Sequence, residues 1–323
     1  MGTNKIYMNK ILCIGEALID MICTDTGSAL AEGNKFIKKP GGAPTNVAAA
    51  IGALGGEVWL AAKTGIDPFG KHLLEVMKDF NVVTDYMLQD EKYFTTFAFV
   101  SLMNDGQRDF YFNRGADGQL TKDEVDTIPL NDFSIIHFGS ATAFLPGPLQ
   151  TAYYSLMQKA QDQNLFISFD PNYRQLLFQN NTKSFIEQSW KFLTVCDFFK
   201  VSDEEAMLLT GKENVEDAAN VFFSKTKATF AITLGEKGTL LGLNKACVLV
   251  PSVPVTAIDT TGAGDAFVGA LLFQLSKMDR LAIEKLALPD WQTIVGNSNK
   301  AGAKTCEYYG AMEAFKHLDK NIF

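Results

Sequence analysis

The chain has 323 residues, of which 47% are hydrophobic and 20% charged, so it is long enough to bury a large core. Its formal net charge of -8 argues against a surface for nucleic acid or for an anionic membrane, because both need clustered positive charge. The five cysteines are scattered and form no CxxC pair, which indicates a reducing compartment and argues against a structural zinc site.

The first apolar segment, ILCIGEALIDMI at 11–22, predicts an opening strand. Glu16 and Asp20 interrupt it, and no small-residue cleavage site follows, so it fits neither a signal peptide nor a membrane-spanning helix. We therefore expect a cytoplasmic protein that does not enter a membrane.

The glycine-rich stretch GGAPTNVAAAIGALGG occupies 41–56. Its paired glycines allow a close backbone approach, Pro44 is suited to open a helix, and Asn46 places an amide in the first turn. Taken alone, the stretch fits a tightly packed helix with a polar cap as well as it fits a binding site.

The next candidate loop, GIDPFGKH at 65–72, comes within one residue of the P-loop pattern. His72 stands where the pattern needs a hydroxyl for magnesium. An ordinary amphipathic helix with Leu73, Leu74, Met77 and Phe80 on its apolar side follows. We therefore interpret this loop as a structural turn.

The stretch TTFAFVSLMNDGQRDFYFNR, at 95–114, has the pattern of β-strands. Two runs in which apolar and polar residues alternate are joined by Asn104, Asp105 and Gly106, which predicts a hairpin. Another short extended pair flanks Gly27. We expect roughly 16–40 and 93–115 to form a small β lid that stands off the main sheet.

From about Asn131 onward, strand-length apolar runs alternate with helix-length amphipathic segments, which predicts βαβ units and a parallel sheet covered on both faces. No repeat or linker divides the chain, so we expect 1–323 to form a single domain. The predicted strands lie at 134–139, 165–170, 197–202 and 229–234, and the predicted helices at 148–163 and around 182–193.

The last motif, DTTGAGDAF at 259–267, joins a glycine turn to an apolar helix. Asp265 admits two explanations: it compensates the helix dipole, or it stands beside an anion held at the helix N-terminus. A dinucleotide-binding fingerprint is excluded, because Phe267 occupies the place of its third glycine. His72, His137 and His317 fit no catalytic or metal pattern and are treated as structural.

Together, GGAPTNVAAAIGALGG and DTTGAGDAF resemble the two signatures of the ribokinase-like (PfkB) family of carbohydrate kinases. The segments ILCIGEALID, KTGIDPFG, SDEEAMLLTG and ITLGEKG extend the resemblance over nearly the whole chain. It implies an α/β fold, a three-layer αβα sandwich with a mainly parallel sheet and a small β lid. It also implies ATP-dependent phosphorylation of a sugar.

Within the family, GGAPTN, FNRGAD, DPNYR and KVSDEE are similar to fructokinases, which implies conversion of fructose to fructose 6-phosphate. Kinases for 2-keto-3-deoxygluconate are the closest alternative, because they also place an arginine in the lid-side segment to meet a carboxylate, so Arg114 alone does not separate the two. Asp117 of FNRGAD favours a polyol over a sugar acid. Ribose and nucleoside kinases of this fold, and a sensor without turnover, are further alternatives.

The resemblance also assigns roles to residues. Asp265 is the expected general base, and the N–H groups of Gly262, Ala263 and Gly264 are expected to stabilise the transferred phosphoryl group. Asp20 could instead be a solvated strand charge. The expected substrate-binding residues are Asp20, Gly41, Gly42, Asn46, Arg114, Asp117, Asp170 and Arg174.

The resemblance also implies which residues bind ATP and its metal ion. Ser202 departs from the asparagine common in ribokinases, which puts a direct phosphate contact in doubt. We expect Mg²⁺ to arrive with ATP and to meet Glu205 through water, and K⁺ to bind at Asp259 and Thr261. A homodimer through the lid is also expected. The expected ATP-binding residues are Lys200, Ser202, Glu205, Thr233, Gly235, Gly238, Gly264 and Asn299. The alternatives are a plain β-turn at 233–238 and a surface position for Asn299.

Overall fold

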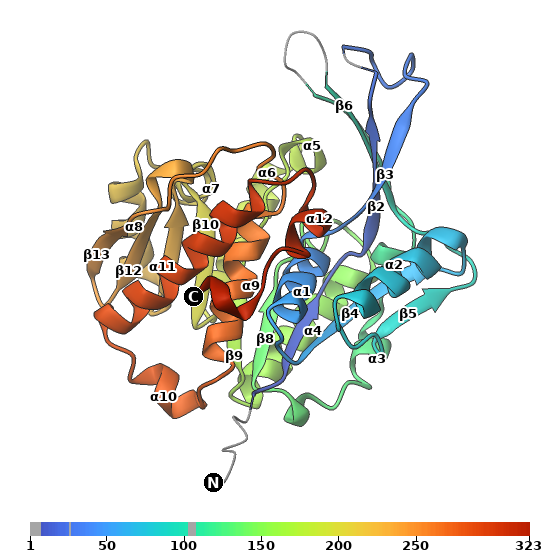
Figure 1. Ribbon diagram of the computed structural model, residues 1–323. Coiled ribbons are helices and arrows are strands. Elements are labelled where there is room, and N and C mark those ends of the chain that lie inside the picture. Colours follow the sequence, from blue (N-terminus) through green and yellow to red (C-terminus); the bar gives the residue numbers. More distant parts are fainter. Residues whose placement is uncertain (1–7, 26, 103–107) are drawn as a thin grey trace, which may run out of the picture.

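The strand-length apolar runs come together in one central sheet (Figure 1). The computed structural model describes residues 8–25, 27–102 and 108–323. The sheet has nine strands in the order β13-β12-β11-β10-β9-β8-β1-β4-β5. Neighbours pair in parallel, except that β12 is antiparallel to both β11 and β13. The strands are β1 (Ile11–Ile14), β4 (Val58–Gly65), β5 (Met87–Asp90), β8 (Ile135–Phe138), β9 (Phe166–Phe169), β10 (Phe198–Ser202), β11 (Thr229–Thr233), β12 (Thr239–Leu243) and β13 (Ala246–Val250).

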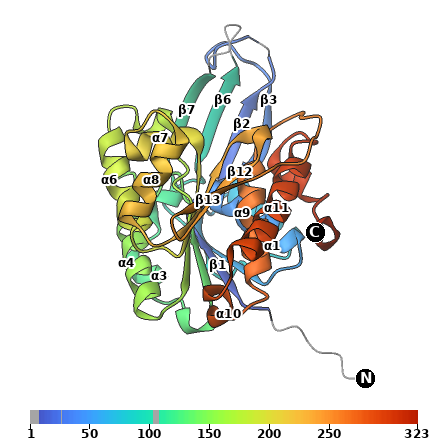
Figure 2. The same cartoon turned by 90° about the vertical axis from the view of Figure 1, so that its left-hand side faces the viewer.

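Helices cover both faces of this sheet, and each face has its own hydrophobic core (Figure 2). Ile11 and Cys13 belong to one core, and Leu12 and Ile14 belong to the other, as expected for a strand buried on both faces. The three-layer αβα prediction is therefore confirmed. The first core includes residues of α1 (Ala43–Ala53), α2 (Pro68–Asp79), α9 (Ala263–Leu275), α10 (Arg280–Glu284), α11 (Leu288–Thr305) and α12 (Ala311–Phe315). The second includes residues of α3 (Lys122–Val125), α4 (Pro148–Asp162), α5 (Gln175–Phe178), α6 (Thr182–Leu193), α7 (Asp203–Thr210) and α8 (Val215–Lys225).

Helices α1 and α9 pack closely against each other. Residues 43–52 of α1 are all buried. A Cβ atom on Gly269 of α9 would lie only 2.7 Å from the Cβ of Ala50, so small side chains set the distance between these helices. This contact joins the two glycine-rich motifs of the sequence.

A second, four-stranded sheet stands off the central one, with the strand order β3-β2-β6-β7 (Figure 1). Its strands are β2 (Leu18–Cys23), β3 (Phe36–Gly41), β6 (Phe97–Leu102) and β7 (Arg108–Asn113). Strands β6 and β7 pair antiparallel, as the hairpin pattern predicts, although the predicted turn at 104–106 lies outside the described residues.

The opening segment does not form one strand, as its apolar run suggested. It divides at residues 15–17, so that β1 belongs to the central sheet and β2 to the small sheet. The chain bends between β1 and β2 at Gly15, whose φ is 146°. The next residue, Glu16, is held at the bend by hydrogen bonds from the N–H groups of Ala43 and Ala141 to its carboxylate. This connection brings the base of the small sheet to the carboxyl edge of β1.

The remaining elements agree with their patterns. Helix α6 has the predicted limits, and α4 ends one residue earlier than predicted. Asp67 caps α2 by accepting from the N–H groups of Phe69 and Gly70 at 3.0 and 2.8 Å, which supports the interpretation of 65–72 as a structural turn. Among the helices of the described residues, none combines the length and apolarity needed to cross a membrane.

Candidate active site

The Gly-Ala-Gly turn leads into the N-terminus of α9. Gly262 is the N-cap, and its φ of 81° lies in the left-handed region that favours glycine. A Cβ atom there would also collide with Ala311. The N–H of Ala263 donates to the carbonyl of Thr260 at 3.2 Å, whereas those of Gly262 and Gly264 have no partner among the described residues. Two of the three expected N–H groups therefore remain available to an anion.

Asp265 lies in the first turn of α9 and is 8% exposed. Asn46, in α1, donates its Nδ2 to Asp265 Oδ2 at 2.8 Å. Burial raises the pKa of Asp265 to about 6, although the Asn46 hydrogen bond and the Lys200 ammonium act in the opposite direction. The carboxylate is ionised at neutral pH and has a basicity suited to proton transfer.

Gly41 and Gly42 precede α1, and the backbone at these two positions is in close contact with acidic residues. A Cβ atom on Gly41 would collide with the carboxylate of Asp20, and one on Gly42 would collide with the carbonyl of Glu16. Burial raises the pKa of Asp20 to about 7, which Arg174 lowers and Glu16 raises. Asp20 is half-buried, so it is not a fully solvated strand charge.

Glu16 was not among the expected site residues, yet it joins three segments. It is 1% exposed and accepts hydrogen bonds from the N–H groups of Ala43 at 3.1 Å and Ala141 at 3.3 Å, and from Ser140 Oγ at 2.5 Å. Burial raises its pKa despite these donors. Its only signal in the sequence is an acidic residue that directly follows an apolar strand. Glu16 fixes the N-terminus of α1 to the loop after β8.

Asp170 and Lys200 were expected on the sugar and nucleotide sides, and they form one buried ion pair at 3.0 Å. Burial alone would lower the pKa of Lys200, but the carboxylates of Asp170 and Glu205 raise it overall. A Cβ atom on Gly264 would lie 3.0 Å from Lys200 Nζ. The ammonium therefore lies against the open N-terminus of α9.

Arg114 and Asp117 are held within the protein. Arg114 donates Nη1 to the carbonyl of Pro146 at 2.9 Å and Nη2 to that of Thr142 at 3.1 Å, and its Nε lies 3.5 Å from Asp117 Oδ2. Asp117 also accepts from Thr142 Oγ1 at 2.9 Å and from Thr96 Oγ1. The pair expected to bind substrate thus ties the end of the small sheet to the loop after β8.

Ser202 and Glu205 form a capping box at the start of α7. Ser202 Oγ accepts from the N–H of Glu205 at 3.1 Å, and Glu205 Oε2 accepts from the N–H of Ser202 at 2.8 Å. Glu205 Oε1 accepts from the N–H of Tyr173 at 2.7 Å. Because a carboxylate oxygen has two lone pairs, each oxygen keeps one acceptor position after these bonds.

Arg174 follows Tyr173 in the DPNYR segment and is exposed. Its Nη1 donates to the carbonyl of Tyr173 at 3.2 Å. The positive charge acts on both Asp20 and Asp265, whose pKa values it lowers. Arg174 is therefore close enough to act on both the sugar-side carboxylate and the expected base.

Three expected nucleotide-side residues lie around the turn after β11. Thr233 ends that strand and donates Oγ1 to the carbonyl of Val201 at 3.3 Å. Gly235, with a φ of 60°, borders open space, whereas Gly238, with a φ of 106°, lies against the backbone that follows β13. A side chain would fit poorly at Gly238, and Gly235 leaves one side of the turn accessible.

Asn299 is buried in α11, so the alternative of a surface position is wrong. Its Nδ2 donates to the carbonyl of Val250 at 3.0 Å, and its Oδ1 accepts from Thr239 Oγ1 at 2.7 Å. Asn299 thus joins α11 to β12 and β13.

Asp259 and Thr261 lie together before the glycine turn. Asp259 Oδ1 accepts from the N–H and the Oγ1 of Thr261 at 2.9 and 2.7 Å, and Oδ2 accepts from the N–H of Gly310 at 2.9 Å. These hydrogen bonds fix the loop that directly precedes Gly262, the N-cap of α9.

The described residues contain no group of three or more histidine, cysteine or acidic side chains arranged for a metal ion. All five cysteines are free. His137 is fully buried beside Ser168 Oγ at 3.1 Å, and burial lowers its pKa to about 3, so it is neutral at physiological pH.

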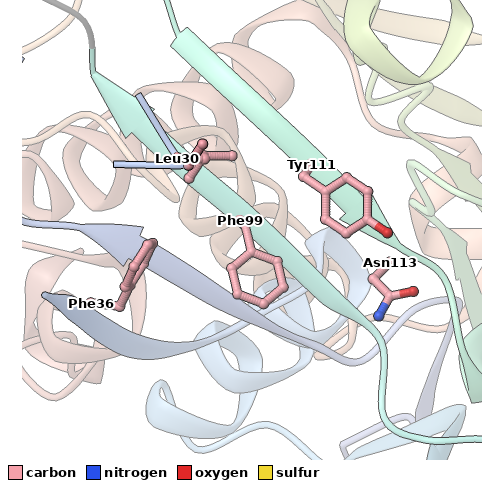
Figure 3. A pocket seen from close by; sticks show the side chains of 6 residues that line it. Leu30, Phe36, Phe99, Tyr111 and Asn113 are labelled. Atoms are coloured by element: carbon pink, nitrogen blue, oxygen red, sulfur yellow. The ribbon is translucent and has the colours of Figure 1, made fainter. Parts of the chain in front are cut away.

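An apolar hollow of about 440 Å³ lies on the small sheet (Figure 3). Phe99 and Tyr111 line it, and Tyr111 is 59% exposed. The expected homodimer through the lid stays a prediction. The other labelled lining residues are Leu30, Phe36 and Asn113.

Known proteins resemble this chain along almost its whole length. It is 37% identical to "Probable fructokinase-4" of Arabidopsis thaliana, over 97% of this chain and 96% of that protein. A fructokinase from Xylella fastidiosa, solved with bound ATP, aligns with a TM-score of 0.85 and 27% identity over 97% of this chain and 96% of that one. A fructokinase from Vibrio cholerae O395, solved with fructose, ADP and a calcium ion, aligns with a TM-score of 0.80 and 27% identity over 98% and 97%. A double mutant of the same enzyme was solved with fructose, ADP and a potassium ion.

The "pfkB family carbohydrate kinase" profile matches residues 8–317. This match spans both glycine-rich motifs and every polar group described above. The chain therefore belongs to the pfkB family of carbohydrate kinases and is an ATP-dependent sugar kinase.

Proposed function

We propose that the chain transfers the γ-phosphoryl group of ATP to the 6-hydroxyl of D-fructose. The observation that carries this proposal is the placement of Asp265 beside the open N-terminus of α9 and in contact with Asn46 of the other glycine-rich motif. The Vibrio cholerae fructokinase was solved with fructose and ADP, which supports the same acceptor here.

In the proposed reaction, Asp265 accepts the proton of the sugar 6-hydroxyl as its oxygen forms the new bond to the γ-phosphorus. The bond between that phosphorus and the β,γ-bridging oxygen breaks, and ADP leaves with the electron pair. A loose transition state needs the proton to be removed only late, so a base with a pKa of about 6 is sufficient.

Charge on the transferred group is neutralised by three groups in this proposal. The N–H groups of Gly262 and Gly264 point positive dipole ends at the anion, and the Lys200 ammonium lies against Gly264. On the sugar side, we propose that Asp20, Gly42 and Asn46 bind hydroxyl groups. Arg114 and Asp117 support them indirectly, and we propose that the small sheet acts as a lid over the sugar.

The residues also fit a divalent metal that is held mainly by the nucleotide. Magnesium keeps most of its waters and uses few protein ligands, and each Glu205 oxygen keeps an acceptor position for such a water. When bound, Mg²⁺ neutralises phosphate charge. The calcium ion in the Vibrio cholerae structure supports a divalent ion in this proposal.

A second acceptor, 2-keto-3-deoxygluconate, is favoured by one observation. Arg174 is exposed and its charge acts on both Asp20 and Asp265, so its guanidinium is available near them to pair with a substrate carboxylate. Fructose remains the proposed acceptor because the two carboxylates already offset this positive charge.

We expect fructose to give the highest kcat/KM in a panel with ribose, glucose, 2-keto-3-deoxygluconate and adenosine. Release of ADP from Mg-ATP measures the rate, and ³¹P NMR of the product identifies the 6-phosphate. A preference of about tenfold for the keto acid would overturn the proposal and make Arg174 a carboxylate clamp. ATP binding without turnover of any acceptor would favour the sensor instead.

We also propose that potassium increases the rate. The ion would bind near Asp259 and Thr261, whose loop fixes the glycine turn, and the potassium ion in the Vibrio cholerae double mutant supports this choice. We expect higher kcat in potassium chloride than in tetramethylammonium chloride at equal ionic strength. Equal rates in the two salts would contradict the proposal.

A further inference from the structure

The hydrogen bond between Asn46 and Asp265 connects positions that are 219 residues apart in the chain. Both side chains lie at the start of buried helices that pack together, and each is 8% exposed. Asn46 Nδ2 takes one oxygen of the carboxylate, Oδ2, at 2.8 Å. Within the described residues, Oδ1 of Asp265 has no such donor and is the oxygen left for a substrate hydroxyl.

The carboxylate also fixes the orientation of the Asn46 amide. An ionised carboxylate only accepts hydrogen bonds, so the NH₂ group must face Asp265 and the amide oxygen must face away. That oxygen, Asn46 Oδ1, is buried and has no hydrogen-bond partner among the described residues. A buried acceptor without a donor is unfavourable, and a second hydroxyl of a bound sugar would satisfy it.

We infer that Asn46, besides the hydroxyl contact proposed above, is a positioning residue that holds Asp265 in the orientation for proton transfer. This inference rests on the proposed role of Asp265 as the base. The pair thereby leaves two acceptor atoms without a donor among the described residues, Asp265 Oδ1 for the reacting hydroxyl and Asn46 Oδ1 for another. This arrangement favours acceptors that carry at least two hydroxyl groups within reach of Asp265 and Asn46.

Electrostatics supports the same role. The Asn46 hydrogen bond lowers the pKa of Asp265 against the larger effect of burial. The other charged groups that act on Asp265 are Asp170, which raises its pKa, and Lys200 and Arg174, which lower it. These three come from other elements and remain in place when Asn46 is replaced. A change in the titration of Asp265 can therefore be assigned to the lost amide.

The test is the pH dependence of kcat for Asn46→Ala and Asn46→Asp, measured between pH 5 and 9 with the best acceptor of the panel. A base acts only when deprotonated, so a higher pKa moves the acid limb to higher pH. We expect a shift of about one pH unit for Asn46→Ala, the size that the loss of one hydrogen bond to a charged group implies. Asn46→Asp places a second carboxylate beside Asp265, so we expect a larger shift, with kcat recovering toward pH 9.

Thr45→Val is the matched control. Thr45 is the neighbouring buried residue of α1, and its Oγ1 donates to the carbonyl of Glu16 at 2.8 Å without contacting Asp265. We expect its acid limb to coincide with that of the wild type. Thermal unfolding of all three variants verifies that they fold.

Rates that fall by the same factor at every pH, with an unmoved acid limb, would overturn the positioning role of Asn46. This result is distinguishable from failure of the proposed function. An acceptor other than fructose changes the proposed substrate but leaves the pH comparison valid with that acceptor. A fully active Asp265→Asn enzyme would instead show that Asp265 is not the base, which contradicts the proposed function itself.

Discussion

Replacement of Asp265 by asparagine is expected to lower kcat by roughly 10² to 10⁴. Asparagine has the size of aspartate but cannot accept the proton of the attacking hydroxyl. The N–H groups of Gly262 and Gly264 are unchanged, so we expect ATP to bind with nearly normal affinity. The measurement is kcat under conditions where a pre-steady-state burst is absent and chemistry limits turnover.

The stability of Asp265→Asn distinguishes a general-base role of Asp265 from simple compensation of the helix dipole. Because burial raises the pKa of Asp265 to about 6, folding disfavours the ionised form, and a neutral side chain removes that penalty. We therefore expect no loss of Tm. A dipole partner would instead lose about 1 kcal/mol of stability with nearly normal turnover. Retention of more than about a third of wild-type kcat would rule out the base role.

The same pKa gives the sign of the pH dependence. Wild-type kcat is expected to fall as the pH drops below about 6, because Asp265 becomes protonated there. Asp265→Asn is expected to lose this acid limb.

Replacement of Lys200 by methionine is expected to give the largest loss of stability, about 3–5 kcal/mol, because it leaves the charge of Asp170 buried without its partner. The pair is 3.0 Å apart, and Asp170 is completely buried. We also expect a loss of at least about 100-fold in kcat, because the ammonium lies beside Gly264. Urea unfolding and steady-state rates measure the two effects.

A double variant separates the two effects. Lys200→Met combined with Asp170→Asn removes the buried charge of Asp170 together with that of Lys200, so we expect most of the lost stability to return while kcat stays low. If kcat recovers together with stability, the ion pair serves only to hold the fold together, and the proposed contribution of Lys200 to phosphoryl transfer is wrong.

The parts of the fold that were predictable depend on local patterns. Alternation of strands and helices after residue 131 predicts a sheet covered on both faces, and the two cores follow from it. The glycine turn before α9 is equally local, since Gly262 needs a positive φ where an apolar helix begins. The expected lid already includes residues 16–22, but the bend at Gly15 that separates β1 from β2 was not predicted, because the apolar run continues on both sides of it.

The partners of buried polar residues were not predictable, since they come from distant segments. Arg114 and Asp117 have the residue types of a sugar site, yet their bonds go to Thr142 and neighbouring groups. Asn299 faces the protein interior from α11 and is not at the surface. The Asn46–Asp265 bond has no signal in either motif taken alone.

The packing of α1 against α9 has a consequence for synthesis of the chain. A ribosome adds about 5–20 residues per second, so α1 emerges roughly 10 to 45 s before the helix that covers it. During that interval the nascent chain exposes the face of α1 that α9 covers in the finished protein, where residues 43–52 are all buried. Truncation before residue 263 is therefore expected to leave an aggregation-prone fragment that chaperones must retain, and this fragment has no turnover because it contains Asn46 but lacks Asp265.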